Sequence, residues 1–268
     1  MSSVSSTGRV VGAWHGAWLR VEGHWTWYRR YWLATLYSTG LQPVLFLAAM
    51  GLGFGSQVRA GPVTGGLSYL AYVAPAMLVA GAAQQGIGDS SYPVLSGFKW
   101  QRDYLAVTAT PVSPGQVLGG HIIWTAIRLT LSGIVYAVIA AFFGAWSNAG
   151  VLAVIVAGTV TGLACATPMV AIAAKTFDEG VRFGLIFRFV VMPMTLFSGT
   201  FFPITQLPLV LRWLAWISPL WHGTQLSRAV SVGGVGGWAA LGHLAFLVAL
   251  FAVGWACAHR FFYRRLVV

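Results

Sequence analysis

Residues 150–173 read GVLAVIVAGTVTGLACATPMVAIA and contain no charged side chain. A helix needs about 20 apolar residues to cross the hydrocarbon core of a bilayer, and this run is long enough. Five further apolar runs occupy residues 33–54, 67–88, 117–143, 183–200 and 239–258. The runs are continuous and do not alternate with polar residues, which favours helices over barrel strands. We therefore expect an all-α integral membrane protein with six transmembrane helices, as a single domain over residues 1–268.

The composition supports a membrane protein. Of 268 residues, 57% are apolar and only 8% are charged, whereas charged residues make up roughly 25% of an average soluble domain. So few charges cannot coat a soluble globule of this size. The composition thus argues against a soluble enzyme, a disordered tail and a nucleic-acid-binding protein.

The positive charges predict the orientation. With a cytoplasmic N-terminus, the outer side receives three arginines, Arg59, Arg212 and Arg228. The inner side receives eleven basic residues: Arg9, Arg20, Arg29, Arg30, Lys99, Arg102, Lys175, Arg182, Arg260, Arg264 and Arg265. Because Lys and Arg accumulate in cytoplasmic loops, both termini are predicted to lie in the cytoplasm, beneath a bacterial inner membrane.

An aromatic stripe precedes the first span. Its members follow one another at intervals of three and four residues, which places them on one face of a helix; they are Trp14, Trp18, Val21, Trp25, Tyr28 and Trp32. Trp and Tyr favour the headgroup level of a bilayer. We predict an amphipathic helix over residues 14–32 that lies in the inner interface as an anchor. The alternative is a cytoplasmic extension of the first span that packs on its neighbours.

The longest cytoplasmic connection, residues 96–114, reads SGFKWQRDYLAVTATPVSP. Its aromatic and charged residues could form a short amphipathic helix that ends before Pro111 and Pro114; they are Phe98, Lys99, Trp100, Arg102, Asp103, Tyr104 and Leu105. Aromatic residues and Arg dominate binding hot spots. The segment therefore suits either a protein partner or a second helix at the headgroup level with no partner.

Three charged residues lie within or at the end of predicted spans: Asp89, Arg128 and Arg188. Each arginine could extend its side chain to the inner surface, and Asp89 is the expected partner of Arg128. No carboxylate lies at mid-membrane, where a proton carrier would need one. We find no catalytic set and no metal-ligand spacing, and His121 and His243 are expected to be packing residues. A GxxxG pair, Gly158 and Gly162, permits close helix contact in the fourth span.

Residues 193–230 read PMTLFSGTFFPITQLPLVLRWLAWISPLWHGTQLSRAV. The segment is apolar but is broken by Pro203, Pro208 and Pro219, so it cannot form a straight span. Irregular backbone survives at membrane depth only where protein or a cavity covers it. We expect a pair of short helices over residues 201–230 that re-enter the outer leaflet between spans five and six.

The runs FSGTFFPITQLP and ISPLWHGTQLSR strongly resemble the signature of ABC-2 type transporter permeases, in particular the nodulation-protein J and daunorubicin-resistance branch. The matching positions are Ser198, Gly199, Phe201, Phe202, Pro203, Gln206, Leu207, Pro208, Pro219, Leu220, His222 and Arg228. The resemblance extends over essentially the whole chain.

The resemblance implies a role for each region. Residues 14–32 would be the connecting helix at the membrane surface, and residues 98–110 the coupling helix seated on an ATP-binding subunit, with contacts from Phe98, Lys99, Trp100, Arg102, Asp103 and Tyr104. The re-entrant helices would form an outer gate that includes Phe197, Ser198, Phe201, Phe202, Pro203, Pro208, Trp213 and Pro219. Spans one, two and five would line the pathway where two permeases meet.

The nucleotide site is expected on another polypeptide. A P-loop needs G-x-x-x-x-G-K-[ST]. Lys99 is followed by Trp, and Lys175 has Met169 and Ala174 where the glycines should stand. No cofactor is therefore expected in this chain, and ATP and Mg²⁺ would bind two cytoplasmic ATPase subunits beneath two permeases, identical or paralogous.

An apolar pathway favours export of a drug, a lipid or a lipid-linked glycan, whose acidic group could meet Arg128 or Arg188. The alternatives are a polysaccharide or glycoconjugate export permease and a membrane scaffold without transport.

The orientation leads to a first testable prediction. A periplasm-active reporter fused after Ser147, between spans three and four, should be active because this loop is predicted to lie outside. Reporter activity in whole cells measures this directly, with a fusion after Lys175 as the inactive control. Cytoplasmic-type behaviour of the Ser147 fusion would contradict the topology.

Overall fold

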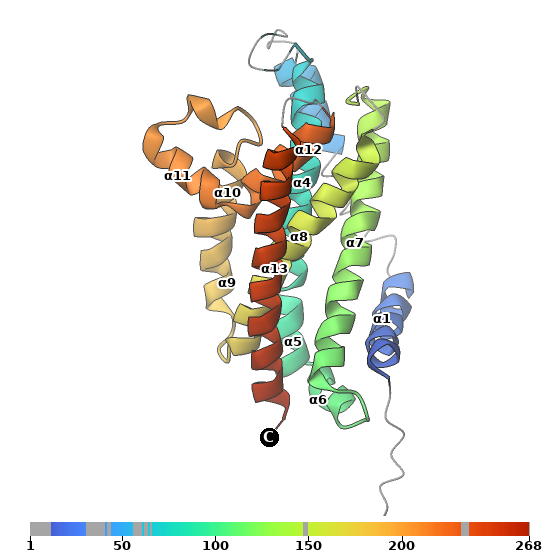
Figure 1. The fold of residues 1–268 in the computed structure, drawn as a ribbon. Coiled ribbons are helices and arrows are strands. Elements are labelled where there is room, and N and C mark those ends of the chain that lie inside the picture. The colour runs from blue at the N-terminus through green and yellow to red at the C-terminus, as the bar shows by residue number, and fades with distance from the viewer. Residues whose placement is uncertain are drawn as a thin grey trace, which may run out of the picture.

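The computed structural model describes residues 12–30, 41, 44–55, 61, 64, 66–146, 150–231 and 236–267, and all regular elements among them are helical. The elements are α1 (Ala13–Arg30), η1 (Ala49–Phe54), α4 (Tyr69–Asp89), α5 (Tyr92–Lys99), α6 (Asp103–Thr108), α7 (Pro114–Phe142), α8 (Val151–Lys175), α9 (Val181–Ile186), η3 (Phe187–Val191), α10 (Met192–Phe197), η4 (Ile204–Gln206), α11 (Leu209–Ile217), α12 (Pro219–Ser231) and α13 (Gly237–Leu266). Figure 1 shows them as an elongated bundle.

Four helical stretches of the described chain are long and apolar enough to cross a membrane: Tyr69–Lys99, Pro114–Phe142, Val151–Lys175 and Gly237–Leu266. They coincide with the second, third, fourth and sixth predicted spans. The residues of the fifth predicted span form three consecutive short helical segments, α9, η3 and α10, which are not among these four stretches. The first, 33–54, lies partly outside the described residues, and its described part ends in the π-helical turn η1. The all-α membrane fold is confirmed, whereas the count of six spans stays a prediction.

Local sequence explains where these helices begin. The Ser113 hydroxyl accepts a hydrogen bond from the backbone N–H of Gln116, and the Gln116 side chain accepts one from the N–H of Ser113. This reciprocal capping satisfies two of the otherwise unpaired donors at the start of α7. Pro114 follows in the first helical position, where a missing N–H costs nothing. The Ser68 hydroxyl caps α4 more simply, by accepting a hydrogen bond from the backbone N–H of Ala71.

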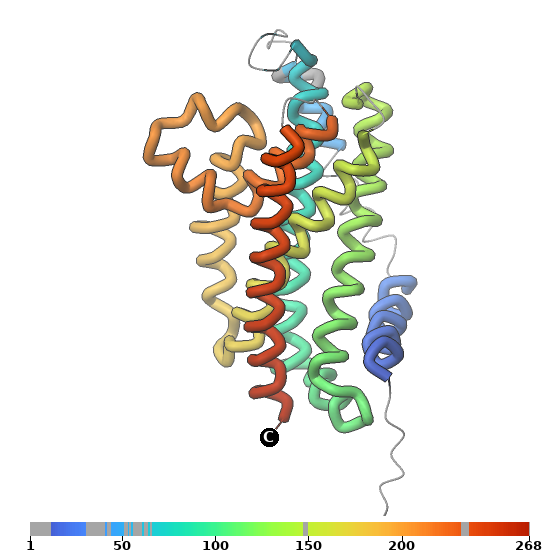
Figure 2. Tube along the Cα trace, viewed as in Figure 1, coloured from blue at the N-terminus to red at the C-terminus, as the bar shows by residue number. Residues whose placement is uncertain are grey.

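The central element is α8, which contacts α4, α7, α12 and α13 and crosses the bundle obliquely between them (Figure 2). Glycines permit the closest of these contacts. A Cβ atom at Gly162 would lie 2.7 Å from the carbonyl oxygen of Ala82 on α4, and one at Gly254 of α13 would lie 2.6 Å from the backbone nitrogen of Pro168. A Cβ at Gly86 would clash with the Gly162 carbonyl. The predicted GxxxG contact is therefore present, between α8 and α4.

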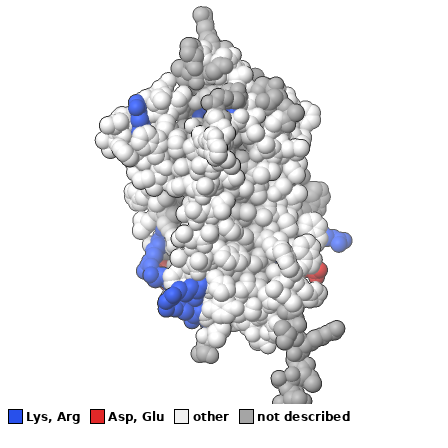
Figure 3. Space-filling model, viewed as in Figure 1, with Lys and Arg blue, Asp and Glu red and all other residues white. Residues whose placement is uncertain are grey.

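The two ends of the bundle differ in content. One end, here the α6 end, carries α5, α6, the start of α9 and the C-terminus, and α1 lies beside the same half of α7 (Figure 1). The opposite end, the α11 end, carries η4, α11 and α12. On the face in Figure 3, a broad band without charged residues separates the charges near the two ends.

The close contact of α8 and α4 generates a second prediction. Gly162→Ala should destabilise the protein by about 1–3 kcal/mol, because the new methyl group meets backbone that cannot move aside. The free energy of unfolding in mixed micelles, from a denaturing-detergent titration, measures the loss. Gly81→Ala is the matched control, since a Cβ there meets no atom within 4 Å. Equal stability of the two variants would show that the helices separate easily.

Candidate functional sites at the two ends of the bundle

The predicted amphipathic helix is present as α1, but its packing face differs from its aromatic face. Gly16, Ala17 and Val21 are buried against α7, whereas Trp14, Trp18 and Trp25 are 79%, 50% and 48% exposed. Tyr28 stands between the two faces, with its ring centroid 5.5 Å from that of Trp124 on α7, and Trp32 lies outside the described residues. The helix thus packs on α7, and packing on a neighbour was a feature of the alternative interpretation. Its tryptophans point outward. Its place in the interface stays a prediction.

Polar side chains of α1 explain this packing. The Arg20 guanidinium donates to the Asp103 carboxylate at 2.5 Å and lies 5.1 Å from the centroid of the Tyr104 ring, which joins α1 to α6. The His24 ring stacks on Trp124 of α7 with centroids 5.8 Å apart. Burial and the nearby Arg20 charge lower the pKa of His24 to about 4, so the imidazole is neutral at physiological pH.

The ion pair predicted between Asp89 and Arg128 is present. Arg128 Nη1 donates to Asp89 Oδ1 at 2.8 Å, and both side chains are largely buried. The pair joins the end of α4 to α7 and compensates both charges within the bundle. A pair of this kind costs far more to break than to leave intact, because either partner alone would be an uncompensated buried charge.

The predicted coupling segment is not one helix. α5 ends at Lys99, and α6 begins at Asp103 after Arg102 in the left-handed conformation (φ 54°). The break turns Phe98 and Tyr104 inward, where they are 5% and 2% exposed and pack edge to face with centroids 4.9 Å apart. The expectation that residues 98–105 form a single amphipathic helix is therefore wrong.

The change of shape redistributes the predicted contact residues. Phe98 and Tyr104 are core residues that pack on Phe262 of α13, and burial raises the pKa of the Tyr104 hydroxyl to about 12. Asp103 is engaged with Arg20. Trp100 and Leu105 remain 50% and 43% exposed, and Arg102 is exposed beside them. The surface of this segment is therefore smaller than the sequence suggested.

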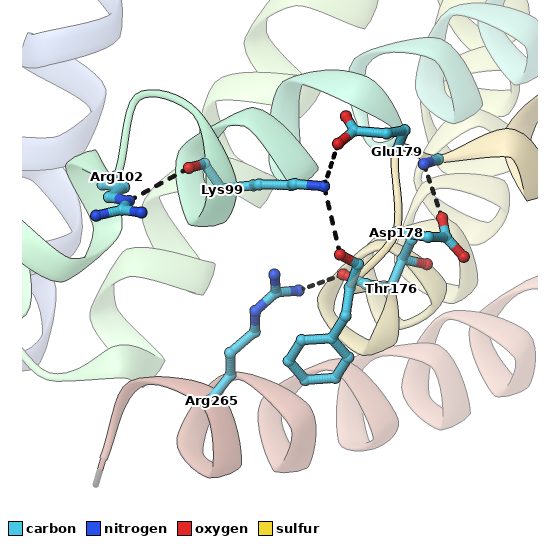
Figure 4. A network of polar contacts seen from close by, with 8 residues as sticks. Lys99, Arg102, Thr176, Asp178, Glu179 and Arg265 are labelled. Carbon is cyan, nitrogen blue, oxygen red and sulfur yellow. Dashed lines mark hydrogen bonds and ion pairs between the residues drawn. The ribbon is translucent and has the colours of Figure 1, made fainter.

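A second loop, which the sequence analysis did not single out, adjoins this surface (Figure 4). Lys99 Nζ donates to Glu179 Oε1 at 2.6 Å, and Arg265 Nη1 donates to the carbonyl oxygens of Ala174 and Thr176 at 2.9 and 2.7 Å. Phe177 lies beneath the Arg265 guanidinium but is 73% exposed. The loop between α8 and α9 is thus tied to α5 and to the C-terminal turn of α13.

At the α11 end, the predicted pair of short helices is present as α11 and α12. The three prolines each introduce a helix: Pro203 precedes η4, Pro208 precedes α11, and Pro219 is the first residue of α12. α12 packs on α4, α8 and α13, whereas α11 exposes Leu209, Val210 and Trp213. Apolar exposure of this extent suits a helix at membrane depth.

Distant parts of the quoted signature meet in one place. Gly199 adopts the left-handed conformation (φ 78°), and Arg228 Nη2 donates to its carbonyl oxygen at 2.7 Å. The Arg228 guanidinium also lies 4.1 Å from the centroid of the Tyr72 ring of α4. The Ser198 and Ser218 hydroxyls are 2.7 Å apart. The turn that follows α10 is therefore clamped to α12.

The aromatic residues of the predicted gate follow this clamped turn. Phe201 lies 5.9 Å, centroid to centroid, from Phe46, and its carbonyl oxygen accepts a hydrogen bond from the Tyr69 hydroxyl at 3.4 Å. Phe197 and Phe202 are half-buried. His243, expected as a packing residue, contacts His222 of the signature, with their Nδ1 atoms 2.9 Å apart. Arg188 is exposed on η3, between α9 and α10.

The comparisons with known proteins agree with this architecture. Nodulation protein J of Rhizobium leguminosarum bv. trifolii is 29% identical over 237 residues, which cover 87% of each chain. Nodulation protein J of Bradyrhizobium diazoefficiens is 30% identical over 219 residues, 81% of this chain and 80% of the relative. The inner membrane transport permease YadH of Escherichia coli K12 is 23% identical over 215 residues, 77% and 80% of the two chains. Residues 18–232 match the family described as ABC-2 type transporter, and the chain therefore belongs to that family.

Proposed function

We propose that this chain is the permease subunit of an ATP-driven exporter in the cytoplasmic membrane. The family match over residues 18–232 carries the proposal, because it runs from within α1 to the end of α12. The family in general implies an ABC ATPase partner. Two copies of the chain, or the chain and a paralogue, would pack side by side above two ATPase subunits, with both termini in the cytoplasm.

The α6 end supports the docking of an ATPase. Trp100, Arg102 and Leu105 are exposed there, and the adjacent loop exposes Phe177. Their support is rigid, since Lys99 is paired with Glu179 and Asp103 with Arg20. In this proposal, closure of the ATPase dimer on ATP pushes on these residues, and α5 and α8 pass the displacement to the rest of the bundle.

The α11 end supports an outer gate. Phe201 and Phe202 follow a turn that Arg228 fixes to α12, and Phe201 contacts Phe46 of the first span. A substrate that leaves past these rings meets aromatic and apolar side chains, which suits an amphiphile such as a drug, a lipid or a lipid-linked glycan. Polysaccharide export is the second candidate for the cargo. A scaffold role without transport would leave ATPase activity unresponsive to substrate.

The docking proposal predicts the effect of truncating the exposed side chains. The double variant Trp100→Ala and Leu105→Ala should lower co-purification of the ATPase about tenfold or more, because interface aromatic residues contribute most of the binding free energy. A pull-down from co-expressing cells, followed by an ATP-dependent transport assay in vesicles, measures both effects. The matched control is Trp238→Ala, an 89% exposed tryptophan at the opposite end. Normal ATPase binding by the double variant would remove the coupling assignment.

The gate proposal predicts a different phenotype. With Phe201→Ala and Phe202→Ala, the ATPase should still bind and hydrolyse ATP, while ATP-driven transport in proteoliposomes falls about tenfold because the outer barrier no longer closes. ATP hydrolysis and transport are measured on the same preparation, again with Trp238→Ala as control. If transport and substrate-stimulated hydrolysis both remain at the unmodified level, these two rings do not form the gate.

A further inference from the structure

Arg188 lies without a partner on the exposed side of the fifth span. It is the second residue of η3, seven positions after the start of α9. Its side chain is exposed and makes no ion pair, hydrogen bond or ring contact with any other residue that the structure describes. At a rise of about 1.5 Å per residue, it stands about 10 Å above the start of the span, as counted from the α6 end.

None of the acidic side chains in the described part of the chain is left to neutralise Arg188. Four of the five acidic residues are in ion pairs: Asp89 with Arg128, Asp103 with Arg20, Glu179 with Lys99, and Asp178 with Arg182. The fifth, Glu22, belongs to α1, which lies on the opposite side of the bundle from α9 (Figure 1). Since the described residues supply no counter-charge for Arg188, we look for one in another molecule.

The structure also distinguishes Arg128 from Arg188, the two arginines that the sequence suggested as contacts for an acidic substrate. Arg128 donates to Asp89 at 2.8 Å and is held between α7 and α4, so its charge is already compensated. Arg188 has no counter-ion among the residues that the structure describes, and its side chain is exposed. A cation within a transmembrane helix is costly unless it is paired or reaches an interface, and such residues mark substrate pathways.

The side chains around Arg188 suit an amphiphile. Leu185, Phe189 and Met192 are 53%, 67% and 65% exposed and lie within one helical turn of Arg188. The π-helical turn η3 departs from regular α-helix at this point, and such turns are frequent at functional sites. An acyl or aromatic tail could lie along this apolar side while an anionic group meets the guanidinium, whose planar donors match a carboxylate, sulfate or phosphate.

We propose that Arg188 binds the anionic group of a transported amphiphile, with the apolar part of the molecule on Leu185, Phe189 and Met192. This proposal rests on the export function above and narrows its substrate class to molecules that carry a negative charge. Two permease copies that pack through the exposed side of the fifth span would bring their Arg188 guanidinium groups together. These groups repel one another unless an anion lies between them, which again favours an anionic amphiphile.

A binding experiment with paired probes tests the proposal without the ATPase. Fluorescently labelled lauric acid and its methyl ester are titrated into the purified permease in a neutral detergent, and fluorescence anisotropy gives the dissociation constants. Arg188→Gln should weaken binding of the acid about tenfold, which is the expected order for one charge-assisted contact. The dissociation constant of the ester should stay unchanged. Arg188→Lys should lie between. Arg182→Gln is the matched control, an exposed arginine one helical turn before Leu185 that is already paired with Asp178.

Two outcomes overturn the proposal: equal affinity of the unmodified protein and Arg188→Gln for the acid, or an equal loss for acid and ester. A second arm repeats the titration in nanodiscs of phosphatidylcholine with and without phosphatidylglycerol. If Arg188→Gln changes only the dependence on phosphatidylglycerol, a lipid headgroup occupies the site and the substrate assignment is wrong. Because binding needs no ATPase, Arg188-dependent binding in a complex that transports nothing would refute the export function and leave the anion site standing.

Discussion

The approach of α8 to its neighbours at backbone distance is the constraint on which the rest of the bundle depends. Lipid tails are as apolar as leucine, so helices in a membrane associate through close packing and polar contacts and not through hydrophobic burial. Gly162 faces the Ala82 carbonyl on α4, and Gly254 of α13 faces Pro168. Gly223 of α12 likewise lies against Thr161 of α8. One helix of small residues therefore fixes α4, α12 and α13 relative to one another.

Electrostatics divides this rigid unit into two unlike ends. Every carboxylate lies on α1, α6, the end of α4 or the loop after α8, so all the ion pairs of the described chain lie in the α6 half. Towards the α11 end, Arg212 and Arg228 are held by carbonyl oxygens instead. Carbonyl oxygens neutralise a guanidinium less completely than a carboxylate does, but they fix the turn that supplies them. The charged half thus suits contact with water, and the other half suits a defined backbone path through an apolar medium.

The sequence predicted most of the helices because a buried membrane segment must satisfy its backbone internally, which an uncharged run such as 150–173 can do only as a helix. It also predicted the Asp89–Arg128 pair, although only Asp89 ends a helix and Arg128 lies in the middle of α7. The loop after α5 was beyond prediction, since a left-handed Arg102 leaves no signal in local propensity, and that one residue decides whether Tyr104 faces a partner or the core. The contact of Arg20 with Asp103 joins residues 83 positions apart, and no periodicity reports such a contact.

At the α11 end, some residues of the family signature hold the backbone in place and are distinct from the aromatic residues proposed to form the gate. Ser198, Gly199 and Arg228 were quoted as a signature, and in the structure they hold backbone in place: the serine meets Ser218, and the arginine meets the Gly199 carbonyl. Phe201, whose ring is proposed to move, lies two residues after Gly199. A gate at Phe201 can therefore swing only with the turn or with α12, and α12 packs directly on α8. In the proposed mechanism, a displacement that starts at Trp100 would reach Phe201 through the same small-residue contacts that hold the bundle together. Coupling and stability would then depend on one set of residues.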